Sequence, residues 1–363
     1  MNNDHQPVIS PVPLVHGGDW AGYMEEYTGA QPLDFSANVS PLGVPSGIIK
    51  AIADAALIAD RYPDPLCRSL CRKISEAEHI PENWILCGNG AADLIFRAVA
   101  ACKPKHALIV APTFAEYEAA LTTTDCQITR YFLRQQGDFR LSEDFLQTIQ
   151  PGIDIVFLCE PNNPTGITTP RELLLKIAQR CRECRSLLIL DECFGDFLNQ
   201  PQAHTLKTSL ADFPGMVILK AFTKMYAMAG VRLGYALCSD NGFLQAMRQA
   251  GQPWAVSSFA QAAGEAALKE CEYVAAVRQL VMEERPWMRR QLEEMGLRVI
   301  PGEANFLLFY CPVKLVQPLR KMGILLRSCA NYHGLDENWY RTAVRTHEEN
   351  IRLIEAIREV LRG

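Results

Sequence analysis

The 363-residue sequence lacks several features that would place a protein in a special class. It has no dense run of Lys and Arg, and its net charge is −5, so neither nucleic acid nor an anionic membrane is an expected partner. No apolar stretch is long enough to span a bilayer, and residues 1–18 contain no apolar signal-peptide core. We find no internal repeat and no low-complexity tract. These absences predict a soluble globular protein.

The 13 cysteines form no pattern that is typical of a metal site. Most stand singly in apolar runs, where a free thiol packs as a small hydrophobic side chain. Cys181 and Cys184 continue an apolar stripe begun by Leu174 and Ile177 at helical spacing, and no second Cys/His pair has matching spacing. We therefore predict no metal, and a reducing cytoplasmic location in which the thiols stay free.

Short apolar runs alternate with helical patterns through the middle of the chain. The runs lie at residues 84–87, 106–112, 127–133, 154–159, 186–191, 216–221 and 232–239. Apolar strands separated by helices are typical of a mostly parallel sheet with helices on both faces, so the predicted fold class is α/β. One helix is predicted over residues 170–185, with Thr169 as N-cap, Pro170 at the first helical position and Glu172 completing a capping box.

The pattern of strands and helices predicts three parts of the chain. Residues 46–255 contain the sheet pattern and form the predicted large domain. Residues 256–363 form a smaller α+β domain, with a helix-rich stretch, two strands and a closing helix at residues 257–296, 305–311, 340–344 and 348–361. Residues 1–45 contain Pro, Gly and Asn throughout and no long periodic element. We expect this segment to lie across the small domain or a partner subunit.

Small and polar residues follow the predicted strands, at the edge where parallel sheets bind ligands. Gly90 and Ala91 precede an apolar helix, a place where an anion can bind, although an ordinary strand-to-helix turn has the same composition. Asn163 lies in a turn that contains two prolines. Asp191 ends a strongly apolar strand, where a buried carboxylate is costly unless it meets a cation. Taken alone, Asp191 would be interpreted as a helix cap or an ion-pair partner.

A lysine completes this set. Lys224 follows the strand at residues 216–221 among apolar neighbours, where desolvation favours its neutral, nucleophilic amine. Pyridoxal 5′-phosphate needs a lysine for a Schiff base, an acid for its ring nitrogen and an anion site for its phosphate. Lys220 is the only rival lysine, and the spacing to Arg232 favours Lys224. The residues together predict this cofactor.

The segment Asn163-Pro164-Thr165-Gly166, Asp191 and the Lys224…Arg232 pair resemble, in order and spacing, the aspartate-aminotransferase fold family of pyridoxal-phosphate enzymes. The resemblance covers nearly the whole chain. It implies fold type I, with a large domain whose mostly parallel sheet lies between helices and a smaller α+β domain. It also implies that Asn163 bonds the 3′-oxygen of the ring, that Asp191 pairs with the ring nitrogen, and that Lys224 holds the cofactor and moves protons at Cα.

The resemblance also assigns the rest of the cofactor site. Phe114 would stack on the ring, and Tyr62 would reach the cofactor phosphate of a neighbouring subunit, which implies a homodimer. Ala221 replaces a frequent Ser or Thr ligand, and Phe194 stands where most aminotransferases have a Tyr. The phosphate would be held by Gly90, Ala91, Thr223 and Arg232.

Several stretches further resemble the threonine-phosphate decarboxylases, which supply aminopropanol phosphate for the cobalamin side chain. This resemblance implies decarboxylation of L-threonine O-3-phosphate to (R)-1-aminopropan-2-yl phosphate. The related histidinol-phosphate aminotransferases usually have Gly at the place of Arg345 and Tyr at that of Phe194. The stretches lie at residues 16–18, 33–38, 112–117, 252–254, 326–332 and 340–345.

A phosphorylated amino acid needs two anion sites besides that of the cofactor. Arg341 stands at the family's position for the α-carboxylate, and Arg327 and Arg345 offer further guanidinium groups. His16 and Asn38 complete the predicted substrate-binding set. A single Arg of this kind could equally form a surface ion pair, but three close together favour ligand binding. Which Arg binds phosphate and which binds carboxylate stays open.

Two other functions stay open beside decarboxylation. One is an aminotransferase that acts on histidinol phosphate or an aromatic amino acid, because reaction type depends on which Cα bond stands perpendicular to the cofactor ring. The other is a non-catalytic binding protein, which would not need Lys224. Phosphothreonine and phosphoserine differ by one methyl group, so the sequence does not separate them as substrates.

Overall fold

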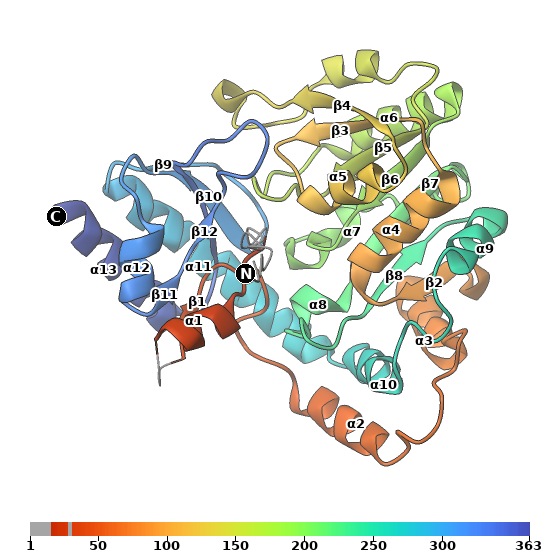
Figure 1. Cartoon of the computed structure of the whole chain (residues 1–363), viewed down its shortest axis with the longest axis horizontal. Helices are drawn as coiled ribbons and strands as arrows, with labels where there is room; N and C mark the ends of the chain where they lie inside the picture. Colours follow the sequence, from red (N-terminus) through yellow and green to blue (C-terminus); the bar gives the residue numbers. More distant parts are fainter. Residues whose placement is uncertain (1–15, 28–30) are drawn as a thin grey trace, which may run out of the picture.

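The structure, a computed structural model, describes residues 16–27 and 31–363. Its centre is a seven-stranded sheet with the order β2-β8-β7-β6-β5-β3-β4 (Figure 1). Strands β3 to β7 run parallel to one another, whereas β8 runs antiparallel to both of its neighbours. The predicted α/β fold with a mostly parallel sheet is thus confirmed. The strands are β2 (Ile85–Gly88), β3 (His106–Ala111), β4 (Gln127–Phe132), β5 (Ile155–Cys159), β6 (Leu187–Asp191), β7 (Met216–Ala221) and β8 (Gly234–Leu237).

Helices cover both faces of this sheet, which explains why its strands are apolar at consecutive positions. Ile189 of β6 belongs to the core on one face, while its neighbours Leu188 and Leu190 belong to the core on the other. The first face is covered by α4 (Gly90–Cys102), α5 (Ala115–Thr122) and α9 (Asn241–Gln249). The second is covered by α3 (Arg68–Glu78), α6 (Arg171–Cys184) and α10 (Ser258–Ala267).

Two local predictions need correction. The capping box predicted for α6 is wrong. The N-cap residue is Pro170, which has no side chain that could cap the helix. Thr169 does not cap it either, because its hydroxyl donates a hydrogen bond to Glu160. The strand predicted over residues 232–239 is shorter, because Arg232 has a φ of 60° and therefore leaves the extended conformation. The other predicted strands agree with the structure to within a residue or two.

A second sheet, with the antiparallel order β12-β13-β10-β9, forms the centre of the C-terminal part. Its apolar face packs on helices and encloses a separate core that includes Met288, Phe309 and Leu353. These elements are α11 (Cys271–Glu294), β9 (Arg298–Val299), β10 (Phe306–Tyr310), α12 (Val316–Lys321), β11 (Ile324–Leu325), β12 (Arg327–Ser328), β13 (Trp339–Ala343) and α13 (His347–Arg362).

The N-terminal segment lies against this C-terminal part. Strand β1 (Leu33–Asp34) pairs in parallel with β11, and Glu26, the last residue of α1 (Trp20–Glu26), accepts a hydrogen bond from Arg320. The prediction for residues 1–15 lies outside the described residues. Helix α10 follows the predicted boundary at residue 255 yet packs on α2 (Ser46–Ala56) and α3. We therefore propose that the large domain extends through α10.

The described ranges contain no helix that is both long and apolar enough to cross a membrane. In the same ranges, no group of three or more His, Cys, Asp or Glu side chains is placed to hold a metal ion. All 13 cysteines are free thiols, and Cys181 and Cys184 are buried in the core under α6, as their spacing predicts.

Candidate active site

Polar side chains from neighbouring strands meet at the carboxyl edge of the sheet. Asp191 is the last residue of β6, Asn163 lies in the loop after β5, and Lys224 lies in the short helix α8 (Phe222–Met225) after β7. A cavity of about 370 Å³ opens there, and we call it the active-site cavity. The predicted site residues that line it are His16, Asn38, Ala91, Phe114, Asn163, Asp191, Thr223, Lys224, Arg232, Arg327 and Arg341.

Asp191 is held firmly at the floor of the cavity. Its side chain is buried, and its Oδ2 accepts a hydrogen bond of 2.7 Å from the hydroxyl of Tyr117. Its Oδ1 accepts a bond of 3.0 Å from the backbone N–H of Cys193. The carboxylate is thus fixed in one orientation. Tyr117 is a positioning partner that the sequence did not reveal, because nothing in its spacing points to Asp191.

Lys224 has the electrostatic surroundings of a reactive amine. Burial, together with the nearby positive charges of Arg341 and Arg232, lowers the pKa of Lys224 to about 8. Its Nζ lies 5.8 Å from the centre of the Phe194 ring. A substantial fraction of neutral amine is therefore present near pH 8, and only the neutral form is nucleophilic.

Lys220, the rival, has the opposite surroundings. Its Nζ lies 2.8 Å from Glu78 and 3.1 Å from Asp196. Burial by itself would lower the pKa of Lys220, but Asp196, Tyr235 and Glu78 together hold it well above its ordinary value. The ammonium is therefore locked in its charged form, and Lys224 is the residue of the two that can act as a nucleophile.

The start of α4 and Arg232 form a cradle for an anion. Gly90 has a φ of +81°, and a Cβ atom there would lie 2.6 Å from Nη2 of Arg232. Ala91, Ala92 and Thr223 line the adjoining wall, beside the free N–H groups of the helix start. Small residues, backbone donors and one guanidinium fit the phosphate of pyridoxal phosphate. Gly90 itself does not line the cavity but lies directly behind Arg232.

Two buried arginines project from the second sheet into the same cavity. Arg327 of β12 and Arg341 of β13 are directly paired across the two strands. Arg341 donates to Asn163 Oδ1 and, at 3.0 Å, to the carbonyl of Ser36. Arg327 donates to Asn331 Oδ1 at 2.9 Å. Two guanidinium groups on one face suit a ligand with two anionic groups.

Asn38 gives an independent sign that this cavity binds a polar ligand. Its side chain is 2% exposed, and among the described residues neither its amide oxygen nor its amide nitrogen has a hydrogen-bond partner. An unpaired buried polar group costs about 1–3 kcal/mol, so such a pair of atoms is typical of a ligand site. The amide of Asn162, by contrast, bonds Pro112 and Thr165 and holds its loop together.

Besides Gly90, two predicted site residues do not line the cavity, namely Arg345 and Tyr62. The guanidinium of Arg345 donates to the carbonyl of Asp34 at 3.2 Å and to Glu349 at 2.8 Å. Tyr62 is 81% exposed and stacks on Trp254 with 4.7 Å between ring centres. The role of Arg345 in substrate binding and that of Tyr62 in a partner subunit's site stay predictions.

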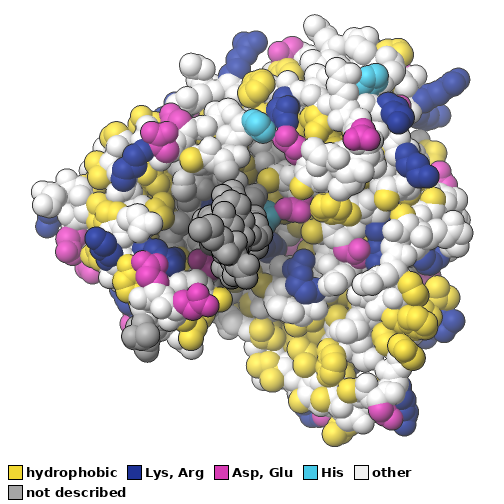
Figure 2. Space-filling model, in the orientation of Figure 1, with side chains coloured by type: hydrophobic (Ala, Val, Ile, Leu, Met, Phe, Trp, Pro, Cys, Tyr) yellow, Lys and Arg dark blue, Asp and Glu magenta, His cyan; other side chains and the backbone are white. Residues whose placement is uncertain are grey.

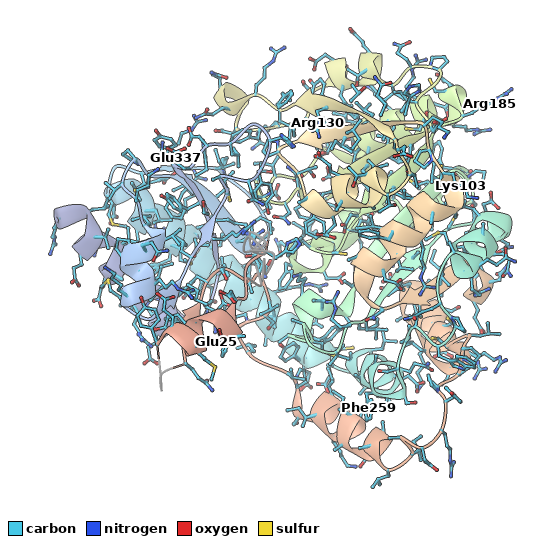
Figure 3. All side chains as sticks on the ribbon, viewed as in Figure 1. Glu25, Lys103, Arg130, Arg185, Phe259 and Glu337 are labelled. Atoms are coloured by element: carbon cyan, nitrogen blue, oxygen red, sulfur yellow. The ribbon has the colours of Figure 1, made fainter. Side chains whose placement is uncertain are left out.

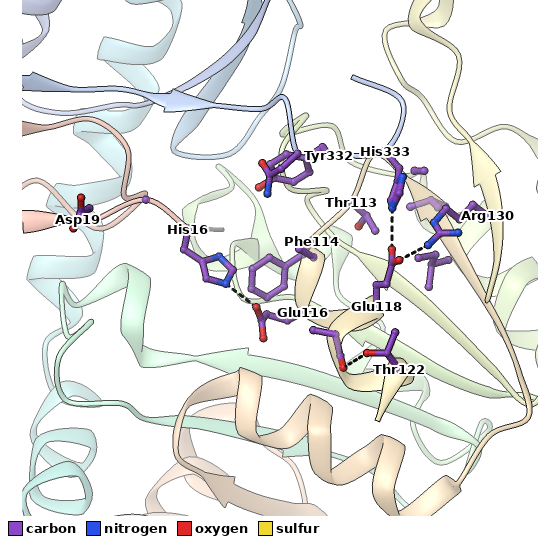
Figure 4. Close-up of a pocket in the computed structure, with 18 residues that line it drawn as sticks. His16, Asp19, Thr113, Phe114, Glu116, Glu118, Thr122, Arg130, Tyr332 and His333 are labelled. Carbon is purple, nitrogen blue, oxygen red and sulfur yellow. Dashed lines mark hydrogen bonds and ion pairs between the residues drawn. The ribbon is translucent and has the colours of Figure 1, made fainter. Parts of the chain in front are cut away.

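The mouth of the cavity carries an acid that the sequence did not single out. Glu116, in the first turn of α5, lies 2.6 Å from His16 Nε2 and beside Phe114 (Figure 4). Both His16 and Glu116 also line a larger outer cavity of about 840 Å³. Tyr332 lines both cavities as well, so these side chains stand where the two spaces meet.

Comparison with known proteins gives a consistent result. The sequence matches the family "Aminotransferase class I and II" over residues 30–357. A threonine-phosphate decarboxylase from Salmonella typhimurium is 41% identical, over 92% of both chains. A bifunctional protein of adenosylcobalamin biosynthesis from Leptospira interrogans is 30% identical, over 96% of this chain and 41% of its own. The structure of the histidinol-phosphate aminotransferase from Clostridium acetobutylicum has a TM-score of 0.84 and 26% identity, over 90% of this chain and 98% of that one.

The family match spans the lysine, the acid, the anion cradle and the two buried arginines of the active-site cavity. The resemblance inferred from the sequence motifs is therefore confirmed over nearly the whole chain. This chain belongs to the class I and II aminotransferase family.

Proposed function

We propose that the protein is a pyridoxal-phosphate-dependent decarboxylase that converts L-threonine O-3-phosphate to (R)-1-aminopropan-2-yl phosphate for cobalamin biosynthesis. The observation that carries this proposal is a reactive lysine, Lys224, that shares one cavity with two buried arginines, Arg327 and Arg341. The names of two relatives support it, one a threonine-phosphate decarboxylase and the other a protein of adenosylcobalamin biosynthesis.

The lower part of the cavity would hold the cofactor. When bound, pyridoxal phosphate draws electrons from the bonds at the substrate's Cα into its ring. Lys224 would bind the cofactor, and its amine, set free when the substrate binds, would return a proton to Cα after carbon dioxide has left. Asp191, oriented by Tyr117, would keep a proton on the ring nitrogen. Phe114 would cover the ring face, and Asn163 would meet the 3′-oxygen.

The upper part of the cavity would select the substrate. The α-carboxylate leaves as neutral carbon dioxide, so a tight ion pair to it in the transition state would oppose its loss. We therefore propose that the two arginines bind different groups of the substrate. Arg341 lies near the α-carboxylate, and Arg327 binds the phosphate. The unpaired amide of Asn38 offers both a donor and an acceptor to the same ligand.

An aminotransferase acting on histidinol phosphate or an aromatic amino acid is the second candidate. The specific observation in its favour is the fold shared with the Clostridium acetobutylicum enzyme. The higher identity to the Salmonella typhimurium decarboxylase favours decarboxylation.

We also propose a homodimer in the cytoplasm. Large apolar side chains are exposed along α2 and the loop after it, with Ile49 57% and Leu57 84% exposed, and Figure 2 shows apolar surface gathered there. Phe259 of α10 lies beside this surface (Figure 3). A partner subunit would cover it and bring Tyr62 to the second site. The 13 free thiols fit a reducing compartment.

The test is to incubate the holoenzyme with threonine phosphate, serine phosphate and threonine and to measure the released carbon dioxide. We expect threonine phosphate to react fastest. Arg327→Ala is expected to lose about 2–4 kcal/mol of transition-state binding, or roughly 30- to 1,000-fold in kcat/KM, for the phosphorylated substrate alone. Arg345→Ala, at a guanidinium outside the cavity lining, tests the predicted role of Arg345: a loss like that of Arg327→Ala would show that Arg345 also binds the phosphate. Equal activity on threonine and its phosphate would remove the phosphate anchor from the proposal.

A further inference from the structure

The charges that line the active-site cavity are unevenly distributed. Within the described part of the chain, its cations are Lys224, Arg232, Arg327 and Arg341, and its only acids are Asp191 and Glu116. Asp191 lies at the floor and is bonded to Tyr117. Among the described residues, Glu116 is therefore the one acid that lines both this cavity and the outer cavity, and a bare carboxylate there would repel the substrate's phosphate.

Glu116 is not bare, because it is paired with His16. Its Oε1 lies 2.6 Å from His16 Nε2, and its side chain is 20% exposed against 54% for His16. The carboxylate accepts the Nε2–H, so Nδ1 is the ring nitrogen left for a ligand. A doubly protonated His16 can then donate Nδ1–H to a phosphate oxygen, while Glu116 balances its charge.

Helix α5 carries a second Glu–His pair, which lies outside the active-site cavity. Glu118 lies 3.2 Å from His333 Nε2 and also pairs with Arg130 (Figure 4). These three side chains line the outer cavity but not the active-site cavity, whereas His16 and Glu116 line both. Two acids two residues apart thus hold two histidines, and only one histidine reaches the site.

We propose that Glu116 is a positioning residue for substrate recognition, which fixes His16 at the mouth of the active-site cavity so that its Nδ1 binds the phosphate of the substrate. This inference rests on the proposed function, because it requires a phosphorylated substrate. Glu116 acts through His16 and does not touch the substrate. Tyr332 is the other titratable group that lines both cavities, whereas Arg327 and Arg341 line only the active-site cavity and Asp19 lines only the outer one.

The test compares holoenzyme variants on threonine phosphate and on threonine. We expect Glu116→Ala to raise the KM for threonine phosphate about tenfold, with kcat changed less than about twofold, because a ligand contact is lost and the chemistry is not. Glu116→Gln keeps an acceptor for Nε2–H, so it is expected to recover part of that loss. Glu118→Gln, the matched control, is expected to leave KM unchanged. Neither Glu116 variant is expected to change kcat/KM for threonine.

A double variant separates positioning from a general structural effect. In a His16→Ala background, Glu116→Ala is expected to cause no further rise in KM and to lower it slightly, because Glu116 aids binding only through His16 and its carboxylate, once bare, would repel the phosphate. Additive losses, or equal losses on threonine and its phosphate, would overturn the inference. The dissociation constant of threonine phosphate, followed by the cofactor's absorbance, is measured in parallel. If the wild type bound threonine phosphate without releasing carbon dioxide, the proposed function would fail, and these constants would still decide the role of Glu116.

Discussion

At the scale of single residues, Lys220 and Lys224 show how the surrounding charges give two identical side chains different protonation behaviour. Lys220 is surrounded by carboxylates and keeps its charge, whereas Lys224 is surrounded by arginines and loses it readily. The spacing to Arg232 alone predicted that Lys224, and not Lys220, holds the cofactor. The physical reason for this choice appears only in the fold, because Glu78 and Arg341 are far from both lysines in the chain.

The surroundings of Lys224 predict a pH dependence. Its pKa of about 8 means that the neutral amine increases as pH rises through 8. We expect the rate at which apoprotein takes up pyridoxal phosphate to increase over the same range and to level off above it. Borohydride reduction followed by peptide mapping is expected to place the label on Lys224, and Lys224→Ala is expected to abolish this labelling. Label on Lys220 would show that the wrong lysine was chosen.

Gly90 offers a test of the anion cradle. In Gly90→Ala, the new Cβ would lie 2.6 Å from Arg232 Nη2, so the guanidinium must move. We expect the dissociation constant of the cofactor to rise roughly tenfold or more, as for the loss of a charge-assisted hydrogen bond. Gly43→Ala is the control, because it has a similar φ of +73° but meets no atom within 4 Å. If both variants weakened binding equally, backbone strain alone would explain the effect.

At the scale of elements, the strands of the large sheet were predictable because burial on both faces makes them apolar throughout. The reversed direction of β8 was not predictable, since its composition resembles that of its parallel neighbours. The predicted N-cap of α6 was wrong for a related reason. Thr169 could cap the helix, but Glu160, in the loop after β5, provides a competing acceptor for its hydroxyl. Local patterns identify elements, and contacts between distant residues decide their ends and order.

Glu78 of α3 accepts hydrogen bonds from three other parts of the chain and gives a prediction at this scale. The donors are Lys207 at 2.6 Å, Lys220 of β7 at 2.8 Å and the hydroxyl of Tyr235 in β8, so Glu78 ties α3 to β7 and β8. We expect Glu78→Ala to lower the free energy of unfolding by about 3–5 kcal/mol, because two buried ammonium groups lose a partner. Urea unfolding measures this change. Asp54→Ala, in the exposed Lys50–Asp54 pair, is expected to cost less than about 1 kcal/mol.

The same residue makes stability depend on acid. Burial would raise the pKa of Glu78, but Lys220 and Lys207 hold it at about 2 against an ordinary 4.5. The folded state therefore binds fewer protons, and about 3 kcal/mol of stability, present above pH 4.5, is lost as pH falls towards 2. Unfolding of Glu78→Gln is expected to show a smaller loss over this range. An identical loss in the variant and the wild type would assign the effect to other groups.

At the scale of the whole molecule, the N-terminal segment and the second sheet complete the site. His16, Asn38, Arg327 and Arg341 reach the active-site cavity from parts of the chain that lie outside the large sheet. The family resemblance predicted their roles, whereas composition and periodicity did not. The same parts contributed Glu116's partner and the loop of Tyr332, whose positions depend on how the parts pack.

Shared active sites are testable by mixing subunits. Tyr62 is exposed in the single chain, and we expect it to complete the site of a partner. Tyr62→Ala and Lys224→Ala homodimers are both expected to be nearly inactive. Their mixture is expected to recover up to about a quarter of the wild-type activity, because random pairing gives about half hybrids with one intact site each. A fully active monomer in sedimentation would refute the shared site.

The central claim is that Cα loses its carboxylate and keeps its nitrogen. The most direct measurement supplies the holoenzyme with threonine phosphate labelled with carbon-13 at the carboxylate, together with 2-oxoglutarate. We predict that label appears in carbon dioxide in a ratio of about one to one with the phosphorylated amine, and that no glutamate forms, because the amine nitrogen stays on Cα. Glutamate formation with the label retained in a phosphorylated 2-oxo acid would contradict the account and identify an aminotransferase.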